Sequence, residues 1–226
     1  MRPRLLALVP AAGGGRRFGG AVPKQLLPVA GRPLILWTVE RLLAVGVDAL
    51  AVALPAAALA APELEALAGP QVKRLAGGAT RQESVARCLA ALPGRPEDLL
   101  LIHDGARPAV HPEDVAAVVA ATRGADGAVL GRSLTDTLKQ VAEGEVVSTL
   151  EREGCFRAET PQVFRREVLE RALAAAAAAG FLGTDESSLV ERLAGVRIRA
   201  VAARRPNPKL TAPGDLAIIE TLLALR

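Results

Sequence analysis

The stretch LLALVPAAGGGRRFGG, residues 5–20, places a short apolar run directly before a glycine-rich loop. Such a run, ending in small turn-forming residues, is typical of a buried strand in an α/β sheet. Glycines let backbone N–H groups approach an anion closely, and Arg17 and Lys24 add positive charge nearby. The stretch therefore predicts a strand that leads into an anion-binding loop. A glycine-rich segment alone is equally compatible with a flexible connection.

The loop matches neither of two common phosphate-binding motifs. It lacks the G-K-[ST] ending of a P-loop. It also fails the G-x-G-x-x-G dinucleotide spacing, because counting from Gly13 and Gly15 the third glycine would have to stand at Phe18. The loop composition by itself therefore indicates a small anion without naming it.

Similar apolar runs recur along the chain, and amphipathic stretches lie between them. The expected strands are residues 5–9, 49–54, 99–102, 128–130 and 196–201, and the expected helices include 33–45, 80–92 and 112–121. Pro33 and Pro112 suit the first turn of a helix, and the alanine-rich run 174–179 is also read as helix. This alternation predicts a Rossmann-like α/β fold, with a mostly parallel sheet, helices on both faces and ligands at the carboxyl ends of the strands.

One segment departs from the alternation of strands and helices. Residues 136–141 and 145–150 alternate apolar and polar side chains around Glu143-Gly144, which predicts a β-hairpin. The hairpin is either a protruding interaction arm or an edge hairpin of the main sheet. No long linker interrupts the sequence, so we expect one domain over residues 1–226, with 136–157 as the arm.

Composition excludes several classes of protein. Of 226 residues, 50% are hydrophobic and 23% charged, which excludes disordered, collagen-like and coiled-coil chains. The 28 basic residues exceed the 24 acidic ones, and only Lys24, Lys73, Lys139 and Lys209 are lysines. Aromatic residues make up 2% with no tyrosine, which argues against single-stranded nucleic acid as a partner and favours a small anionic ligand. Nucleotide composition of the source explains the arginine and alanine bias equally well.

The cysteines and the first apolar run bear on the compartment. Cys88 and Cys155 have no metal-type spacing and could form one disulfide at most. The run 5–9 is shorter than a membrane span or the core of a secretory signal. We therefore expect a cytoplasmic protein with no membrane partner.

Several motifs, in order along nearly the whole chain, resemble the 2-C-methyl-D-erythritol 4-phosphate cytidylyltransferase family. The matching segments are PAAGGGRRFGG with PKQ within residues 10–25, GGATRQESV at 77–85, HDGARP at 103–108, DTLK at 136–139, TLER at 149–152, TPQ at 160–162, TDE at 184–186 and PKLT at 208–211. Many separate motifs in a fixed order are far more specific than a single glycine-rich loop.

The resemblance implies transfer of a cytidylyl group from CTP, the co-substrate, to 2-C-methyl-D-erythritol 4-phosphate, with Mg²⁺ or another divalent cation as cofactor. It also implies a homodimer in which the arm reaches the partner. A phosphate monoester is already an anion near neutral pH, so it needs no general base to attack the α-phosphate. The reaction needs positioning and neutralisation of crowded negative charge instead.

The resemblance also assigns roles to individual residues. It implies that Arg17 and Lys24 bind the triphosphate of CTP and that Arg152 and Lys209 hold the attacking phosphate. Arginine can bind a phosphate with two parallel hydrogen bonds, whereas lysine acts as a point charge. The residues implied for the nucleotide are Ala11, Ala12, Gly13, Gly78, Arg81, Ser84, Asp104 and Gly105. Those implied around the methylerythritol phosphate are Ala106, Arg107, Thr137, Thr160 and Thr184.

Two of the motifs can also be interpreted from local chemistry. Thr80 and Glu83 form a capping-box pattern, so residues 77–84 are expected to enter a helix whose N-terminus lies near the nucleotide. Asp104 follows the apolar run 99–102 and should emerge at the carboxyl end of a central strand. It is the best candidate to approach Mg²⁺, directly or through water. For His103 we expect a structural hydrogen bond.

One departure from the family pattern concerns the acceptor. The family often has an acidic residue that touches the polyol just before Asn207, and this chain has Pro206 there. Asp185 or Glu186 could supply a substitute contact, or the acceptor could be another polyol phosphate such as ribitol 5-phosphate. A non-catalytic nucleotide-binding module is the alternative from another class. The scattered arginines and few aromatic residues argue against nucleic-acid binding despite the basic pI of 9.7.

Overall fold

The computed structural model describes residues 2–13 and 23–225, so Arg17 lies outside the described residues. The main sheet has the strand order β11-β7-β10-β6-β1-β4-β5. All its strands run parallel except β10, which is antiparallel to both neighbours. The strands are β1 (Leu5–Pro10), β4 (Ala49–Leu54), β5 (Val72–Ala76), β6 (Leu99–Ile102), β7 (Gly127–Ser133), β10 (Phe156–Arg165) and β11 (Ile198–Ala202). The mostly parallel sheet predicted from the alternation is confirmed.

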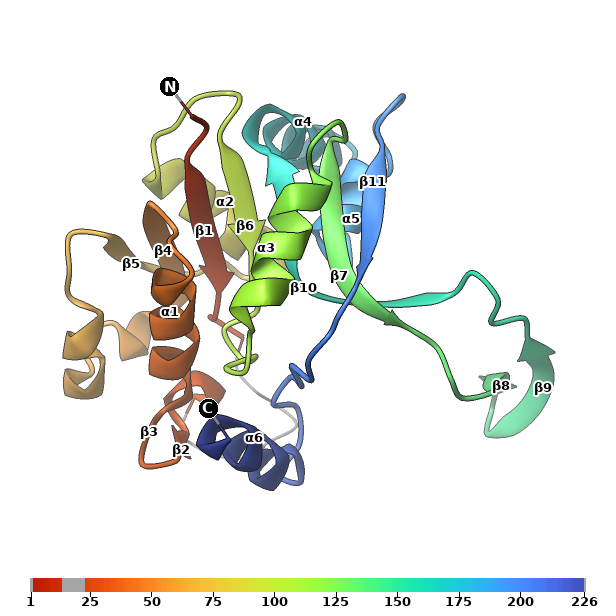
Figure 1. Ribbon diagram of the computed structural model, residues 1–226, viewed down its shortest axis with the longest axis horizontal. Helices are drawn as coiled ribbons and strands as arrows, with labels where there is room; N and C mark the ends of the chain where they lie inside the picture. Colours follow the sequence, from red (N-terminus) through yellow and green to blue (C-terminus); the bar gives the residue numbers. More distant parts are fainter. Residues whose placement is uncertain (1, 14–22, 226) are drawn as a thin grey trace.

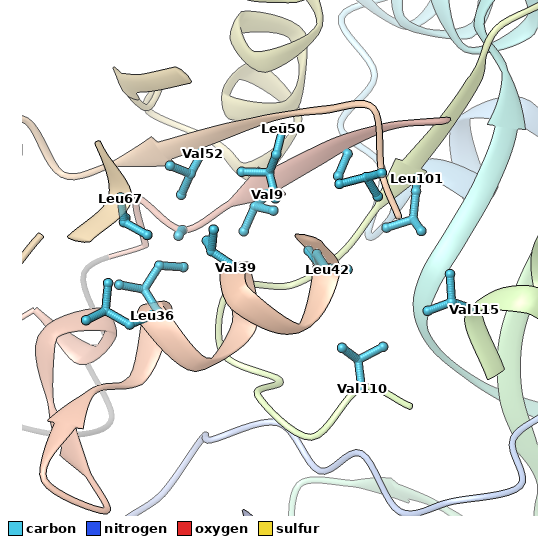
Figure 2. Close-up of a cluster of buried hydrophobic side chains, with 14 of the residues drawn as sticks. Val9, Leu36, Val39, Leu42, Leu50, Val52, Leu67, Leu101, Val110 and Val115 are labelled. Atoms are coloured by element: carbon cyan, nitrogen blue, oxygen red, sulfur yellow. The ribbon is translucent and has the colours of Figure 1, made fainter. Parts of the chain in front are cut away.

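Helices cover both faces of this sheet, as expected (Figure 1). One face carries α1 (Leu34–Ala44) and α3 (Pro112–Ala121), and the other carries α2 (Arg81–Ala91), α4 (Arg166–Ala178) and α5 (Glu186–Val190). Successive side chains of a strand point to opposite faces, so β1 sends Val9 to the first core and Leu8 to the second. Figure 2 shows the first core, where Val9 and Val52 face Leu36 and Val39 of α1. The sheet is therefore buried on both sides.

A third apolar cluster closes the end of the molecule near the carboxyl ends of β1 and β6. There α6 (Asp215–Ala224) packs beside the short pair β2 (Pro28–Val29) and β3 (Arg32–Pro33). The buried members of the cluster are Val29, Leu34, Ala106, Leu210, Ile219 and Leu223. The remaining elements are 3₁₀ turns, η2 (Lys24–Leu26), η3 (Ala56–Ala58) and η4 (Pro62–Leu67). No helix in residues 2–13 or 23–225 is both long and apolar enough to cross a bilayer.

The predicted hairpin is present as β8 (Leu138–Ala142) and β9 (Glu145–Leu150). It forms a sheet of its own and projects from the body of the molecule, so the alternative of an edge hairpin in the main sheet is wrong (Figure 1). Its turn places Glu143 and Gly144 at positive φ. The last two residues of the expected arm, Phe156 and Arg157, already pair with β7 in the main sheet.

Asp98 fastens the amino ends of β1 and β6 together. Its buried carboxylate accepts hydrogen bonds from the backbone N–H groups of Arg4 and Arg95, both at 2.9 Å, and from both guanidinium groups. Burial acts to raise the pKa of Asp98, but the hydrogen bonds from Arg95 and Arg4 outweigh it and hold that pKa well below its ordinary range. The carboxylate is therefore ionised and fully engaged.

Asp98→Asn is expected to lower the free energy of unfolding by about 3 kcal/mol, because it leaves buried donors without their charged acceptor. Since the folded pKa is depressed, the stabilisation is complete above the unfolded value of about 3.9 and is lost as pH falls below it. Urea unfolding across that range checks both effects. The exposed Asp136→Asn serves as the control. Equal unfolding free energies for the Asp98 variant and the parent would contradict the expectation.

Candidate active site

A cavity of about 490 Å³ opens where β1 and β6 end. This is the position expected for a ligand in an α/β sheet. Its walls come from the segment after β1, the start of α2, the segment after β6, η2 and the segment before α6. Of the residues predicted from the sequence, it is lined by Ala12, Gly13, Lys24, Gly78, Arg81, Ser84, Asp104, Gly105, Ala106 and Lys209.

Small residues make one wall of the cavity close-packed. A Cβ added to Gly77 would lie 2.1 Å from the Cβ of Ala12, so the loop before α2 contacts the segment after β1 without room for a side chain. Ala11 is buried behind this wall and donates its N–H to the Ala53 carbonyl at 2.8 Å. Ala11 therefore supports the cavity without lining it. Likewise, a Cβ on Gly105 would lie 2.6 Å from that of Ala11.

The start of α2 presents organised polar groups to the same wall. Thr80 caps the helix by accepting the N–H of Glu83 at 3.0 Å, as predicted. The strongest backbone hydrogen bond to the Glu83 carboxylate comes from the N–H of Ala79 at 2.8 Å, and the backbone of Thr80 adds a weaker one. Ser84 Oγ accepts the N–H of Gly78 at 3.0 Å and donates to the Thr80 carbonyl. These bonds hold the loop in one shape.

Three cations surround Asp104 at the floor of the cavity. Its carboxylate lies 2.9 Å from Lys209 Nζ, 3.3 Å from Arg81 Nε and 3.4 Å from Arg107 Nε. Burial favours a raised pKa for Asp104, but Arg81, Lys209 and Arg107 overcome it and hold the pKa well below its usual range. The Asp104 N–H donates to Thr160 Oγ1 at 3.1 Å, so β10 helps to fix this charged group.

One basic and one amide side chain of the PKQ motif, Lys24 and Gln25, reach the opposite wall. Lys24 Nζ donates to the Leu210 carbonyl at 2.8 Å, which places its ammonium beside the segment that carries Lys209. Gln25 is buried and donates its Nε2 to the Gly13 carbonyl at 2.9 Å. Gln25 is not among the predicted site residues, although it belongs to the PKQ motif at residues 23–25. Its hydrogen bond fastens the end of the β1 segment to η2.

His103 makes the structural hydrogen bond expected of it. Its Nε2 donates to the Arg107 carbonyl at 3.0 Å, because a carbonyl only accepts. The side chain is fully buried, and burial lowers its pKa to about 4, so it is neutral at pH 7. The ring therefore stabilises the turn that follows β6 and keeps Asp104 and Arg107 in place.

Other predicted residues do not line this cavity in a single copy of the chain. Arg152 and Thr137 belong to the arm, and the Arg152 guanidinium donates to the Thr135 carbonyl. Arg152 lines a separate depression at the base of the arm. Thr184 is exposed on the loop before α5. Arg107 lies beside the cavity and donates to the Asn207 carbonyl at 2.8 Å, which fixes the segment before Lys209.

The comparison with protein families decides the identity. A sequence model of 2-C-methyl-D-erythritol 4-phosphate cytidylyltransferase matches residues 5–225. The chain belongs to this family. A family relative from Xanthomonas campestris pv. campestris is 44% identical over 97% of this chain and 84% of its own length. A Symbiobacterium thermophilum relative is 41% identical over 96% of this chain and 91% of its own. Both relatives are named 2-C-methyl-D-erythritol 4-phosphate cytidylyltransferase.

Solved structures agree with this family assignment. The crystal structure of 2-C-methyl-D-erythritol 4-phosphate cytidylyltransferase from Thermus thermophilus is similar, with a TM-score of 0.81, 36% identity and coverage of 99% of this chain and 100% of that one. A 4-diphosphocytidyl-2C-methyl-D-erythritol synthase has a TM-score of 0.84 and 32% identity, covering 99% of both chains. The family fold therefore extends over nearly the whole chain, including the elements that form the cavity.

Proposed function

We propose that this chain transfers a cytidylyl group from CTP to 2-C-methyl-D-erythritol 4-phosphate and releases pyrophosphate. The observation that carries the proposal is the cavity at the ends of β1 and β6. There a wall of small residues faces Lys24, Lys209 and Asp104 in a chain of this cytidylyltransferase family. The small residues leave room for a nucleotide against the backbone, and the cations offset the charge of its phosphates.

The reaction is an in-line attack of the acceptor phosphate on the α-phosphorus of CTP. The acceptor is already anionic, so the protein's contribution is orientation and charge neutralisation. Lys24 and Arg17 stabilise the charge that develops on the α-phosphate and the leaving pyrophosphate. Lys209 and Arg152 hold the attacking phosphate. The proximity of Lys24 to the Leu210 carbonyl, one residue beyond Lys209, supports a shared site for both substrates.

A divalent cation, with Mg²⁺ as the proposed one, fits the residues that face the cavity. Mg²⁺ takes oxygen ligands, keeps several waters and commonly binds one or two carboxylates together with substrate phosphates. Asp104 is the carboxylate among the described lining residues, and its lowered pKa keeps it ionised. In residues 2–13 and 23–225 no three His, Cys, Asp or Glu side chains form a metal cluster. Asp104 would therefore hold the cation with the CTP phosphates, and the bound cation would neutralise phosphate charge.

The proposal includes a homodimer in which each arm delivers Arg152 to the site of the partner. The position of Arg152 outside the cavity of its own chain supports this arrangement. So do the exposed apolar side chains of the arm, Val141, Val146 and Val147. We also propose that the protein is cytoplasmic, because its two cysteines do not form the disulfide framework typical of secreted proteins. The expectations of no nucleic-acid partner and no membrane partner stay predictions.

Acceptor identity is tested directly by a phosphorus NMR time course. Purified protein, CTP and Mg²⁺ are mixed with methylerythritol 4-phosphate in one tube and with ribitol 5-phosphate in another. Pyrophosphate and a new diphosphate ester are expected only with methylerythritol 4-phosphate, which would show that Pro206 is compatible with that acceptor. Turnover only with ribitol 5-phosphate would show that ribitol 5-phosphate is the acceptor instead. CTP binding without turnover in both tubes would favour the non-catalytic module.

A further inference from the structure

Glu186 is a buried carboxylate for which the proposed reaction has no role. It is the first residue of α5 and is 1% exposed. Both carboxylate oxygens lie 2.6 Å from Nη1 of Arg81, which lines the cavity on the side of the small-residue wall. Burying a carboxylate is costly unless a charged partner compensates for it, and here the partner is a residue of the nucleotide site.

The backbone around Glu186 is fastened from two other elements. From β10, Gln162 donates its Nε2 to Asp185 Oδ2 at 2.6 Å and accepts the N–H of Ser187 at 3.1 Å. Asp185 in turn caps α5 by accepting the N–H of Ser188 at 2.9 Å. From α2, Gln82 accepts the N–H of Gly183 at 3.1 Å. These hydrogen bonds fix the first turn of α5 and therefore the position of Glu186.

Arg81 lies between two carboxylates, and each one binds a different part of its side chain. Asp104 contacts Nε at 3.3 Å, and Glu186 contacts Nη1 at 2.6 Å. A free arginine has several rotatable bonds, and ordering them on ligand binding costs affinity. Without Glu186, the acidic partner left to Arg81 would be Asp104, which also binds Lys209 and Arg107. Glu186 therefore fixes the Nη1 end of the Arg81 guanidinium, while Asp104 is shared among Arg81, Lys209 and Arg107.

We propose that Glu186 is a positioning residue that holds the Arg81 guanidinium in the orientation that binds the nucleotide. The inference rests on the proposed function, since it assumes that the wall near Arg81 receives CTP. The carboxylate acts through Arg81 and does not touch the reacting phosphates. Its removal should therefore affect binding of CTP much more than the chemical step.

The test compares Glu186→Gln with the parent in steady-state kinetics and in equilibrium titration with CTP. The KM and Kd for CTP are expected to rise about tenfold, the size of one charge-assisted hydrogen bond, with kcat and the acceptor KM within about twofold. In the double variant Arg81→Ala/Glu186→Gln, the Kd should equal that of Arg81→Ala alone, because Glu186 acts through Arg81. Glu170→Gln likewise removes the negative charge from a 2.7 Å pair, with Arg166 on α4 and outside the cavity, and serves as the matched control, with an unchanged Kd expected.

The outcomes separate this inference from the proposed function. The inference would be overturned by an unchanged Kd in Glu186→Gln, or by effects of the two substitutions that add in the double variant. Turnover by the parent would still support the proposed function in that case. If the parent binds CTP without turnover, the function fails and the Kd ratios still test Glu186. A parent that does not bind CTP overturns both. Should Glu186→Gln fold poorly, Glu186→Asp keeps the charge one methylene further back, and an intermediate Kd is expected.

Discussion

Lys24→Ala is expected to lower kcat about 10²- to 10³-fold, a loss of about 3 to 4 kcal/mol of transition-state stabilisation. The ammonium of Lys24 lies at the cavity wall and donates to the Leu210 carbonyl at 2.8 Å. A cation at this position compensates for charge that grows on the α-phosphate and on pyrophosphate during transfer. Because that charge is greatest in the transition state, the substitution should lower kcat more than it weakens CTP binding.

Pyrophosphate release, followed over a range of CTP concentrations, measures kcat and the KM for CTP of the Lys24 variant. The matched control is Lys73→Ala, since Lys73 is an exposed lysine on the edge strand β5, and its kcat should equal that of the parent. A higher KM for CTP with an unchanged kcat would contradict the assignment. It would instead make Lys24 a residue that binds the nucleotide equally in the ground state and in the transition state.

Mixing two inactive variants is expected to restore activity if Arg152 acts across the dimer. Arg152→Ala and Lys24→Ala each disable every site of their own homodimer. In the mixed dimer, the site built on the Arg152→Ala subunit has its own Lys24 and receives Arg152 from the partner, so it is complete. Random pairing at equal concentrations should therefore recover about a quarter of the parent activity, because half the dimers are mixed and each has one complete site.

The mixing experiment requires subunit exchange, which gentle denaturation and refolding of the mixture provides. Each variant treated alone in the same way is the control and should stay inactive. Activity in the mixture no greater than in these controls would place Arg152 in the site of its own chain or outside catalysis. The parent carried through the same procedure calibrates the recovery.

Much of the sheet could be predicted because buried parallel strands are plain apolar runs. The runs that became β1, β4 and β6 needed no other information. Strand β10 was missed because Glu159, Thr160, Pro161 and Gln162 interrupt its apolar pattern, and proline argues against a central strand. The pairing with β7 shifts register between Ala158 and Gln162, which accommodates that segment. Strand β5 was missed because Lys73 and Arg74 give it the character of an edge.

The site could be predicted where motif residues sit at strand ends and helix starts, since topology alone brings these places together. Gly13, Gly78 and Asp104 illustrate this, as all line one cavity. Glu186 could not be assigned its contact, because its partner Arg81 lies 105 positions away and nothing local marks a buried carboxylate. The position of Arg152 relative to a site depends on a second copy of the chain, which sequence patterns do not place.

The insertion of β10 between β6 and β7 bears on the order of folding. Among the residues that the structure describes, β6 and β7 do not pair with each other, and β10 joins the half-sheet β5-β4-β1-β6 to β7 and β11. During synthesis, residues 156–165 emerge after every strand of the first half. We therefore expect a nascent chain that ends before residue 156 to lack the strand that joins the two halves of the sheet. Thr160 and Gln162, which secure Asp104 and α5, arrive on that same strand. The strand that joins the two halves of the sheet is therefore also the strand that secures one side of the cavity, whose last lining residues, Lys209 and Thr211, follow it in the chain.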